Sequence, residues 1–258
     1  MIAFLLDEGN PVMLLKVSAA ILVIGGTIMA TVISFRVSTV LKFPGYIRRA
    51  FFEQSEDPLE LVQTFVRLAE KARREGLLSL EDEAQQLGDP FLRDGIQEVV
   101  DGTPPEQIEE LLEIRIAEME ARHREGAEFF EQAGGFAPTM GIIGTVMGLV
   151  NTLAKLAEAG TEKLGESIAT AFIATLYGIG TANLFWLPIS KRLRQKSEAE
   201  AARMRMMVAG ILAIQQGDAP RLVRTKLEGF LSPVDQQRSR QAGQTGPALG
   251  AAETAGAR

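Results

Sequence analysis

Two threonines, Thr145 and Thr175, stand in long stretches of the chain that carry no Asp, Glu, Lys or Arg. A single hydroxyl in such a stretch is usually a packing residue that bonds back to its own helix. Membrane proteins that move ions generally need an ionisable group to bind the ion. If this chain moves ions, the acid must therefore come from another chain.

Composition excludes several other kinds of chemistry. The chain has no cysteine, so it has no disulfide, no thiol nucleophile and no thiolate metal site. Its one histidine, His123, excludes a multi-histidine metal cluster, and among neighbouring charges we expect it to be structural. A net charge of −6 and a pI of about 5.1 argue against binding to nucleic acid. We expect no enzyme activity, no metal and no cofactor.

Three uncharged runs are long enough to cross a membrane, namely Val17–Phe35, 133–154 and 167–190. A hydrocarbon core about 30 Å thick needs roughly 20 residues of helix. Alternation typical of β-strands is absent. The sequence therefore predicts an all-α membrane protein with transmembrane helices at 12–35, 133–154 and 167–190, surrounded by membrane lipid.

Flanking charges predict the orientation of these helices. Cytoplasmic loops near membrane spans carry an excess of Lys and Arg. Basic residues follow the first and third runs, at Arg36, Lys42, Arg48 and Arg49 and at Lys191, Arg192, Arg194 and Lys196. We therefore expect 36–132 and 191–231 to be cytoplasmic and a short loop at 155–166 to be periplasmic.

The first cytoplasmic segment is predicted to be helical. Asp57 and Asp89 each precede a proline, which is typical of an N-cap followed by proline at the first helical position. Ser79 and Thr103 begin patterns that resemble capping boxes. The helix from Pro104 meets no breaker before the second run, so it should continue directly into the membrane.

The second cytoplasmic segment should continue the third span as a charged helix to Arg205. The apolar stretch 206–215 can then pack against the first segment, and another amphipathic helix should start near Pro220. The tail at 232–258 lacks apolar periodicity, so we predict that it is disordered.

Small residues line the second and third runs at helical spacing, which allows another helix to approach closely. These helix-packing glycines are Gly141, Gly144, Gly148 and Gly178. Pro138 removes one backbone hydrogen bond inside the second run and should weaken the helix there. Pro188 marks the expected cytoplasmic end of the third span.

Two long motifs, APTMGIIGTVMGLV (137–150) and ATAFIATLYGIGTANLFWLP (169–188), resemble the MotA stator family of the bacterial flagellar motor. MotA belongs to a wider MotA/TolQ/ExbB group of ion-driven five-subunit rings. The cytoplasmic motif ARREGLLSLEDE (72–83) is similar to the MotA segment that faces the rotor. The resemblance covers residues 15–232.

The number of spans departs from that family, because MotA proteins have four spans and three are predicted here. TolQ and ExbB proteins have three, with the N-terminus outside, so the count alone favours them. The motifs REGLLSLE and LYG…ANLF favour MotA. We expect Val17–Phe35 to correspond to the family's second span and the first to be encoded upstream of Met1.

The resemblance implies a homo-pentamer around a single-span MotB-type partner, whose membrane aspartate carries the ion, in the bacterial inner membrane. It implies ion-pathway roles for Thr145 and Thr175, and helix-gating roles for Pro138 and Pro188. The residues that match rotor contacts, facing the flagellar rotor switch protein, are Arg73, Arg74, Glu81 and Asp82.

The coupling ion is expected to be a proton, and sodium is the less favoured alternative. Sodium-driven relatives carry two adjacent threonines before the LYG motif, whereas this chain has Ala174 and Thr175 there. Two other function classes stay open. A TolQ/ExbB-type proton-channel energiser would power an envelope protein in place of a rotor, and a membrane scaffold would use these helices only to oligomerise.

Overall fold

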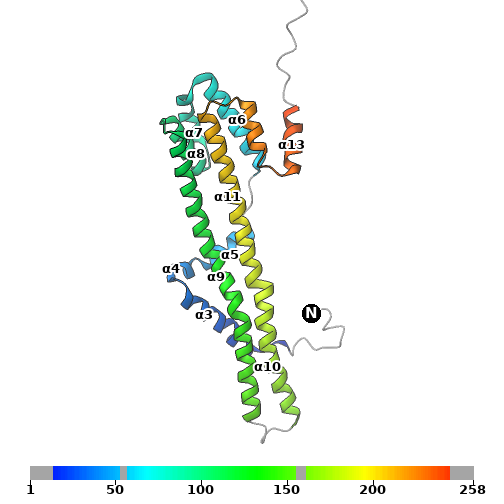
Figure 1. Ribbon diagram of the computed structural model, residues 1–258. Helices are drawn as coiled ribbons and strands as arrows, with labels where there is room; N and C mark the ends of the chain where they lie inside the picture. Colours follow the sequence, from blue (N-terminus) through cyan, green and yellow to red (C-terminus); the bar gives the residue numbers. More distant parts are fainter. Residues whose placement is uncertain (1–13, 53–56, 155–160, 245–258) are drawn as a thin grey trace, which may run out of the picture. The chain divides into compact units, whose positions relative to one another are not determined.

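The structure, a computed structural model, describes residues 14–52, 57–154 and 161–244, and in these ranges it is all-helical (Figure 1). Three of its helical segments are long and apolar enough to cross a membrane. They are Val17–Ser34, Pro105–Ala154 and Ser167–Gln215. The expectation of three apolar helices of spanning length is therefore confirmed.

The chain divides into two compact units. Unit 1 comprises Met1–Glu53 and Glu120–Glu198, and unit 2 comprises Gln54–Met119 and Ala199–Arg258. Helix α9 contributes its first part to unit 2 and the rest to unit 1, and α11 contributes in the opposite order.

The first apolar helix of unit 1 consists of α2 (Val17–Ala20), the π-helical turn η2 (Ile21–Gly25) and α3 (Gly26–Ser34). Residues 12 and 13 of the predicted span lie outside the described residues, and 14–16 precede the helix. Tyr177 fixes this start, because the Lys16 backbone N–H donates to its hydroxyl at 3.2 Å and the hydroxyl donates to the Leu14 carbonyl. Two short helices follow, α4 (Val37–Leu41) and α5 (Phe43–Phe52).

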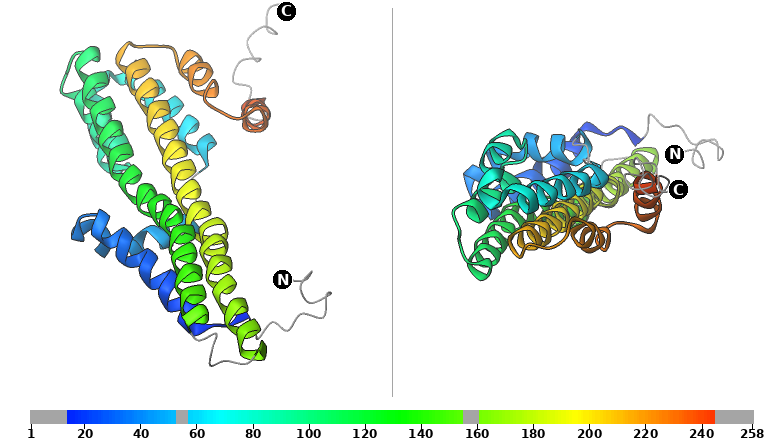
Figure 2. Two further views of the ribbon diagram at one scale, coloured as in Figure 1. Left: turned by 60° about the horizontal axis from the view of Figure 1, so that its bottom comes forward. Right: turned by 90° about the horizontal axis from the view of Figure 1, so that it is seen from above.

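Helices α9 (Pro105–Ala154) and α10 (Thr161–Thr181) lie side by side in unit 1 (Figure 2). As predicted, α9 runs without a break from Pro105 through the whole second apolar run. The predicted loop 155–166 is wrong in part. Residues 155–160 lie outside the described residues, whereas 161–166 form the first turns of α10.

Neither proline ends a helix. Pro138 lies inside α9, which continues past it. Pro188 was expected to mark the end of the span and not of the helix, and the predicted continuation of the helix is confirmed: α10 passes through the π-helical turn η4 (Ala182–Trp186) into α11 (Leu187–Gln215). Because proline lacks an N–H, it leaves a carbonyl one turn earlier without its helical partner. The π-turn lies where this adjustment is needed, and the Leu187 N–H bonds to the Ala182 carbonyl, five residues back.

An aromatic cluster forms the part of the core of unit 1 that lies between α5, α9 and η4. The ring centroids of Phe43 and Phe130 lie 5.3 Å apart, and those of Phe130 and Trp186 lie 6.2 Å apart. Trp186 is only 5% exposed. A tryptophan near a span end is typical of the membrane interface, but this one belongs to the core.

Unit 2 is built from α6 (Pro58–Glu75), the 3₁₀ turn η3 (Leu77–Leu80), α7 (Glu81–Gln86) and α8 (Pro90–Val100), with the ends of α9 and α11 and with α12 (Pro220–Glu228). Its core holds Phe65, Ile96, Leu112, Ile211 and Leu227, all fully buried. The expectation that 206–215 packs on residues of the segment 36–132 is thus confirmed.

Two of the four predicted caps are confirmed. The Asp57 side chain accepts from the Leu59 N–H at 3.0 Å, and Asp89 accepts from Phe91 N–H at 2.8 Å. The other two predictions are wrong. The Ser79 hydroxyl donates to the Gly76 carbonyl, because this stretch forms a 3₁₀ turn, and the Thr103 hydroxyl donates to Glu98.

The predicted disorder of 232–258 is wrong for its first part. Helix α13 covers Pro233–Gln244, and residues 245–258 lie outside the described residues. The Ser232 hydroxyl accepts from the Asp235 N–H at 3.2 Å, as an N-cap does. Ser239 then donates to Glu228 at 2.6 Å. Because polar contacts hold this helix, its sequence has no apolar periodicity, and the helix could not be predicted from such a pattern.

Candidate functional site

The hydroxyl oxygens of Thr145 on α9 and Thr175 on α10 lie 2.5 Å apart. Thr145 Oγ1 also lies 2.9 Å from the Ala171 carbonyl oxygen and 3.1 Å from that of Gly141. Each hydroxyl has one hydrogen, so when Thr145 donates to a carbonyl, Thr175 is the donor within the pair. The structure thus brings the two candidate ion-pathway residues into one hydrogen-bonded pair between two helices.

Glycines allow the close approach that forms this pair. A Cβ atom at Gly178 would lie 2.6 Å from the Ala137 carbonyl oxygen and 3.1 Å from Gly141 Cα. A Cβ at Gly141 would lie 2.9 Å from the Ala174 carbonyl oxygen. The obstructing atoms are backbone atoms, so a side chain at either glycine would push α9 and α10 apart.

The other two predicted packing glycines, Gly144 and Gly148, face alanines of α10. A Cβ at Gly144 would lie 2.8 Å from Ala174 Cβ, and one at Gly148 would lie 2.8 Å from Ala171 Cβ. All four glycines therefore lie in the α9–α10 contact, and we call this contact the threonine seam. Pro138 belongs to it as well, since its Cα lies 3.2 Å from the position of a Cβ at Gly178.

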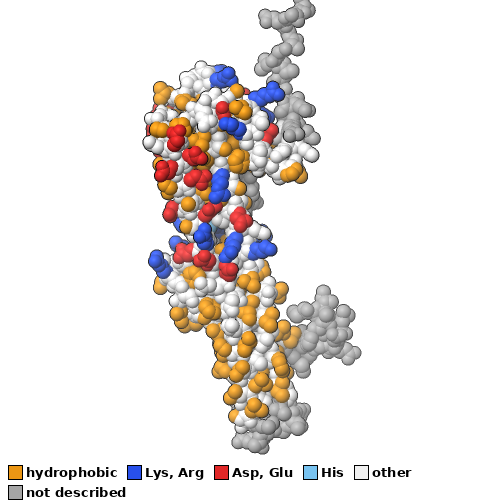
Figure 3. Space-filling model, viewed as in Figure 1, with side chains coloured by type: hydrophobic (Ala, Val, Ile, Leu, Met, Phe, Trp, Pro, Cys, Tyr) orange, Lys and Arg blue, Asp and Glu red, His pale blue; other side chains and the backbone are white. Residues whose placement is uncertain are grey.

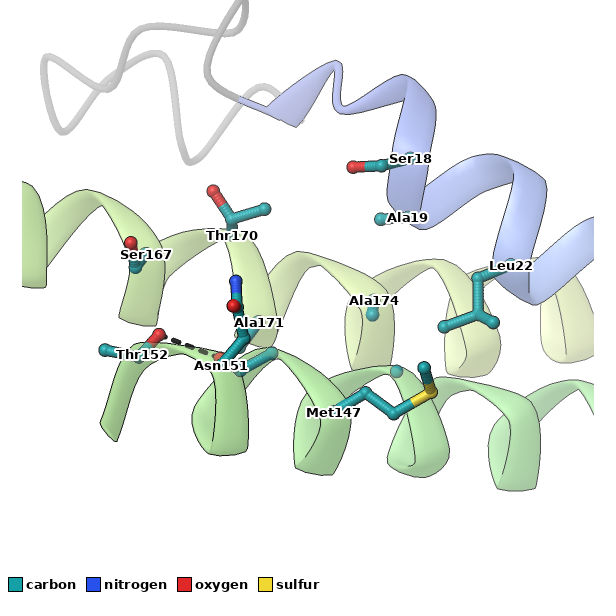
Figure 4. Close-up of a pocket in the computed structure, with 12 residues that line it drawn as sticks. Ser18, Ala19, Leu22, Met147, Asn151, Thr152, Ser167, Thr170, Ala171 and Ala174 are labelled. Atoms are coloured by element: carbon teal, nitrogen blue, oxygen red, sulfur yellow. Dashed lines mark hydrogen bonds between the residues drawn. The ribbon is translucent and has the colours of Figure 1, made fainter. Parts of the chain in front are cut away.

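A pocket of about 610 Å³ adjoins the threonine seam, between α2, η2, α9 and α10 (Figure 4). Its polar lining consists of Ser18, Asn151, Thr152, Ser167 and Thr170. Its other lining residues are apolar or glycine, and none of the lining residues is charged. The sequence analysis did not identify this pocket, because hydroxyl and amide side chains within an apolar run are usually interpreted as packing residues. The clustering of polar residues at 151–152 and 167–170 is the one sequence signal of this pocket.

The exposed surface around this site is apolar. At the lower end of the view in Figure 3, where the apolar part of α9 lies beside α10, the described side chains are hydrophobic or uncharged. Large apolar residues that are at least half exposed include Val146, Val150, Phe172 and Leu176. In water such a surface would be unfavourable, whereas in a bilayer it matches its surroundings.

Charged groups of unit 1 gather at its opposite end, near the aromatic cluster. His123 Nε2 lies 3.0 Å from Arg49 Nη1, and Arg194 pairs with Glu131. Tyr46 of α5 packs against Gly126, and burial, followed by the nearby Glu125 carboxylate, raises the pKa of its phenol. These contacts give His123 the structural surroundings expected for it.

The predicted rotor-contact residues lie in unit 2 at one helix junction. Arg73 and Arg74 are in the last turn of α6, and Glu81 and Asp82 are in the first turn of α7. All four are exposed. Gly76, with φ of 88°, makes the turn between them. These charges also complement the helix dipoles, so their position alone does not assign them a partner.

Comparison with known proteins gives consistent matches over most of the chain. A model of the MotA/TolQ/ExbB proton channel family matches residues 83–206. The chain is 40% identical to the uncharacterised protein YtxD of Bacillus subtilis, over 87% of this chain and 82% of that protein. It is 39% identical to motility protein A of Borreliella burgdorferi, over 86% of this chain and 84% of that protein.

Two solved structures match with a TM-score of 0.85. One is MotAB of C. jejuni, at 28% identity and covering 90% of each chain. The other is the flagellar MotAB stator complex of Bacillus subtilis, at 36% identity and covering 90% of this chain and 91% of that one.

Three apolar helices of spanning length, with large apolar side chains exposed on them, are typical of a multi-pass membrane protein. The chain belongs to the MotA/TolQ/ExbB proton channel family. It is accordingly a channel-type subunit and not an enzyme.

Proposed function

We propose that the chain is the stator subunit of a bacterial flagellar motor and converts ion flow across the inner membrane into torque on the rotor. The relatives named motility protein A and the MotAB structures support this function. In this proposal five copies form a ring around two copies of a MotB-type single-span partner. The segments of unit 2 and the basic ends of the spans lie in the cytoplasm.

The threonine seam is the observation that carries the mechanism. Thr145 and Thr175 offer two hydroxyls in the apolar runs 133–154 and 167–190, which contain no carboxylate and no lysine. A buried carboxylate is costly unless it is hydrogen-bonded or neutralised. The partner's aspartate therefore supplies the ion-binding group, and the hydroxyl pair supplies hydrogen bonds that change as the ion is bound or released.

Ion passage can drive rotation because the partner helices cannot fit a ring of five equivalently. Each change in the charge of the partner's aspartate favours a different packing of that helix against the ring. Such bistable packing gives discrete steps. Each elementary charge that crosses the membrane supplies about 2.3 kcal/mol per 100 mV.

The translocated ion in this proposal is a proton. Dehydrated sodium needs several oxygen ligands, and Ala174 supplies a methyl group where a second hydroxyl would stand. Ala174 is also 3% exposed and lies against Gly144, so the packed seam leaves little room for a bulkier ligand there.

Deleting the gene and observing tethered cells tests the stator function. We expect cells that assemble flagella but do not rotate, with rotation restored in discrete speed steps as the chain is expressed again. Normal rotation without the chain would contradict the proposal and favour an envelope energiser.

Rotation speed at varied external sodium, with pH and membrane potential held constant, tests the ion. We expect the speed to stay constant and a protonophore to stop the motor. A speed that falls to zero as sodium is withdrawn would show that sodium is the coupling ion.

A further inference from the structure

Helices α4 and α5 form a basic segment with one side packed on unit 1 and one side exposed. Residues 36–52 contain four Lys or Arg and no Asp or Glu, although the whole chain has a net charge of −6. On the packed side, Phe43, Tyr46 and Ala50 join the aromatic cluster. The exposed side, which we call the basic face, consists of Arg36, Val37, Leu41, Lys42, Arg48 and Phe51.

Polar contacts fix the orientation of this segment. The Thr39 hydroxyl of α4 donates to the Glu125 carboxylate of α9. At the end of α5, the Arg192 side chain of α11 donates to the Ala50 carbonyl at 2.6 Å, and Lys196 donates to the preceding carbonyl, also at 2.6 Å. These bonds satisfy carbonyls that a helix end leaves without a partner. The basic face is therefore held outward.

The apolar part of the basic face suits a membrane surface. Val37 and Leu41 lie one turn apart on the same side of α4 and are 73% and 76% exposed, and Phe51 is 53% exposed. Helix α4 begins three residues after the apolar helix that ends at Ser34. A segment at the end of a span, with exposed apolar side chains beside cations, is typical of helices that lie between lipid headgroups and acyl chains.

The cations of the basic face are available to a ligand. Arg36, Lys42 and Arg48 are exposed, and their side chains make no ion pair or hydrogen bond with the described part of the chain. Arg49, by comparison, lies 3.0 Å from His123. Each Lys or Arg near an anionic membrane surface strengthens binding about fivefold. Three such cations without a nearby carboxylate on their own segment favour an anionic lipid over a neutral one.

We propose that the basic face binds anionic phospholipid, with Val37 and Leu41 against acyl chains and with Arg36, Lys42 and Arg48 on headgroup phosphates. The proposed function supplies only the leaflet, which is the cytoplasmic one. Vesicles with the same lipids in both leaflets test the binding without it.

A fluorescent probe on the basic face can report which lipid touches it, because the chain contains no cysteine of its own. Leu41→Cys would be labelled with bimane, and the complex with its partner would be reconstituted into mixed phosphatidylglycerol and phosphatidylcholine. Brominated acyl chains, which quench bimane on contact, would be placed on one lipid at a time. We expect phosphatidylglycerol to quench at least about threefold more strongly per mole than phosphatidylcholine. At Phe172→Cys, a position 60% exposed on α10, we expect equal quenching by the two lipids.

Removing the cations tests whether charge causes the preference. We expect equal quenching by the two lipids in the triple variant Arg36→Gln, Lys42→Gln and Arg48→Gln, and a partial loss of preference in Lys42→Gln alone. The matched control makes the same change of net charge in unit 2 and should keep the full preference; it combines Arg67→Gln, Arg221→Gln and Arg224→Gln.

Three results would overturn the proposal. Equal quenching by both lipids in the unmodified chain would show that the face touches lipid without selecting its charge. Absence of quenching by either lipid would show that protein covers the face. A preference that survives in the triple variant would show that other groups select the lipid. If the reconstituted complex conducts no ions, the proposed function fails, while the quenching still decides whether the basic face binds anionic lipid.

Discussion

At Thr145 one hydroxyl makes two contacts with helix α10, with Thr175 at 2.5 Å and with the Ala171 carbonyl at 2.9 Å. Hydrogen bonds between membrane helices contribute about 0.6 kcal/mol on average and about 1.7 kcal/mol at most. Losing them therefore weakens the seam only slightly. A functional defect in a hydroxyl-deleting variant would then report on the ion path and not on folding.

Thr145→Val and Thr175→Val keep the side-chain volume and remove the hydroxyl. We expect normal membrane insertion and complex formation, with motor torque and ion flux lowered about tenfold, and Thr145→Ser close to the unmodified protein. Torque of tethered cells and proton uptake by vesicles measure this. Thr31→Val is the matched control, because Thr31 is buried and bonds to Thr27 in its own helix at 2.8 Å. Full torque in both valine variants would assign the pair to packing alone.

At the scale of the element, the contact between α9 and α10 depends on glycines that no other residue can replace. Gly178→Ala would place a methyl group 2.6 Å from the Ala137 carbonyl oxygen, while Gly180→Ala would meet nothing within 4 Å. Overpacking of this kind costs roughly 1–3 kcal/mol. We expect Gly178→Ala to lower the melting temperature of the purified complex and to reduce ion flux. Equal melting temperatures for the two variants would mean that the seam is looser than the structure shows.

The start of α8 is a second element whose stability can be tested. Asp89 accepts from the N–H groups of Phe91 and Leu92 and also pairs with Arg203 at 2.7 Å. Asp57 caps α6 but is exposed, and among the described bonds its side chain accepts from Leu59 alone. An N-cap contributes about 1 kcal/mol, and the ion pair of Asp89 adds to it.

We therefore expect Asp89→Ala to destabilise the protein by about 2 kcal/mol and Asp57→Ala by about 1 kcal/mol. Thermal unfolding of the purified complex measures the difference. A larger loss for Asp57→Ala would show that the Arg203 contact contributes nothing.

At the scale of the whole molecule, the proposed function makes exposed charges of unit 2 the candidates for passing torque to the rotor. Arg73 and Glu81 lie on either side of the Gly76 turn, and both are exposed. Exposed charge pairs contribute less than about 1 kcal/mol each, or about a fivefold change in affinity. Weak contacts that exchange quickly suit a stepping interface.

Reversing either charge, by Arg73→Glu or Glu81→Lys, should lower torque at high load by a few-fold, with partial recovery when the facing charge on the rotor is reversed. Torque of tethered cells across a range of loads measures this. Arg67→Glu is the matched control, because Arg67 is exposed on the same helix two turns earlier. Equal torque for all three variants would show that these charges only face solvent.

Local physics explains what the sequence alone determined about this protein. The three apolar helices follow from run length, because a bilayer requires all backbone groups to be satisfied within a helix. The unbroken course of α9 and the caps at Asp57 and Asp89 follow from residues within a few positions of each other. The motifs around Thr145 and Thr175 were sufficient to identify the family, but they did not determine the distance between the two hydroxyls.

Tertiary structure decided which of these residues meet. The hydroxyl pair joins residues 30 positions apart, and the pocket brings together polar groups from three helical segments. The burial of Trp186 and helix α13 also depended on partners distant in sequence or on polar contacts. A sequence pattern reflects only interactions between residues that are close along the chain. A contact between two helices depends on how closely their backbones approach, which such a pattern does not determine.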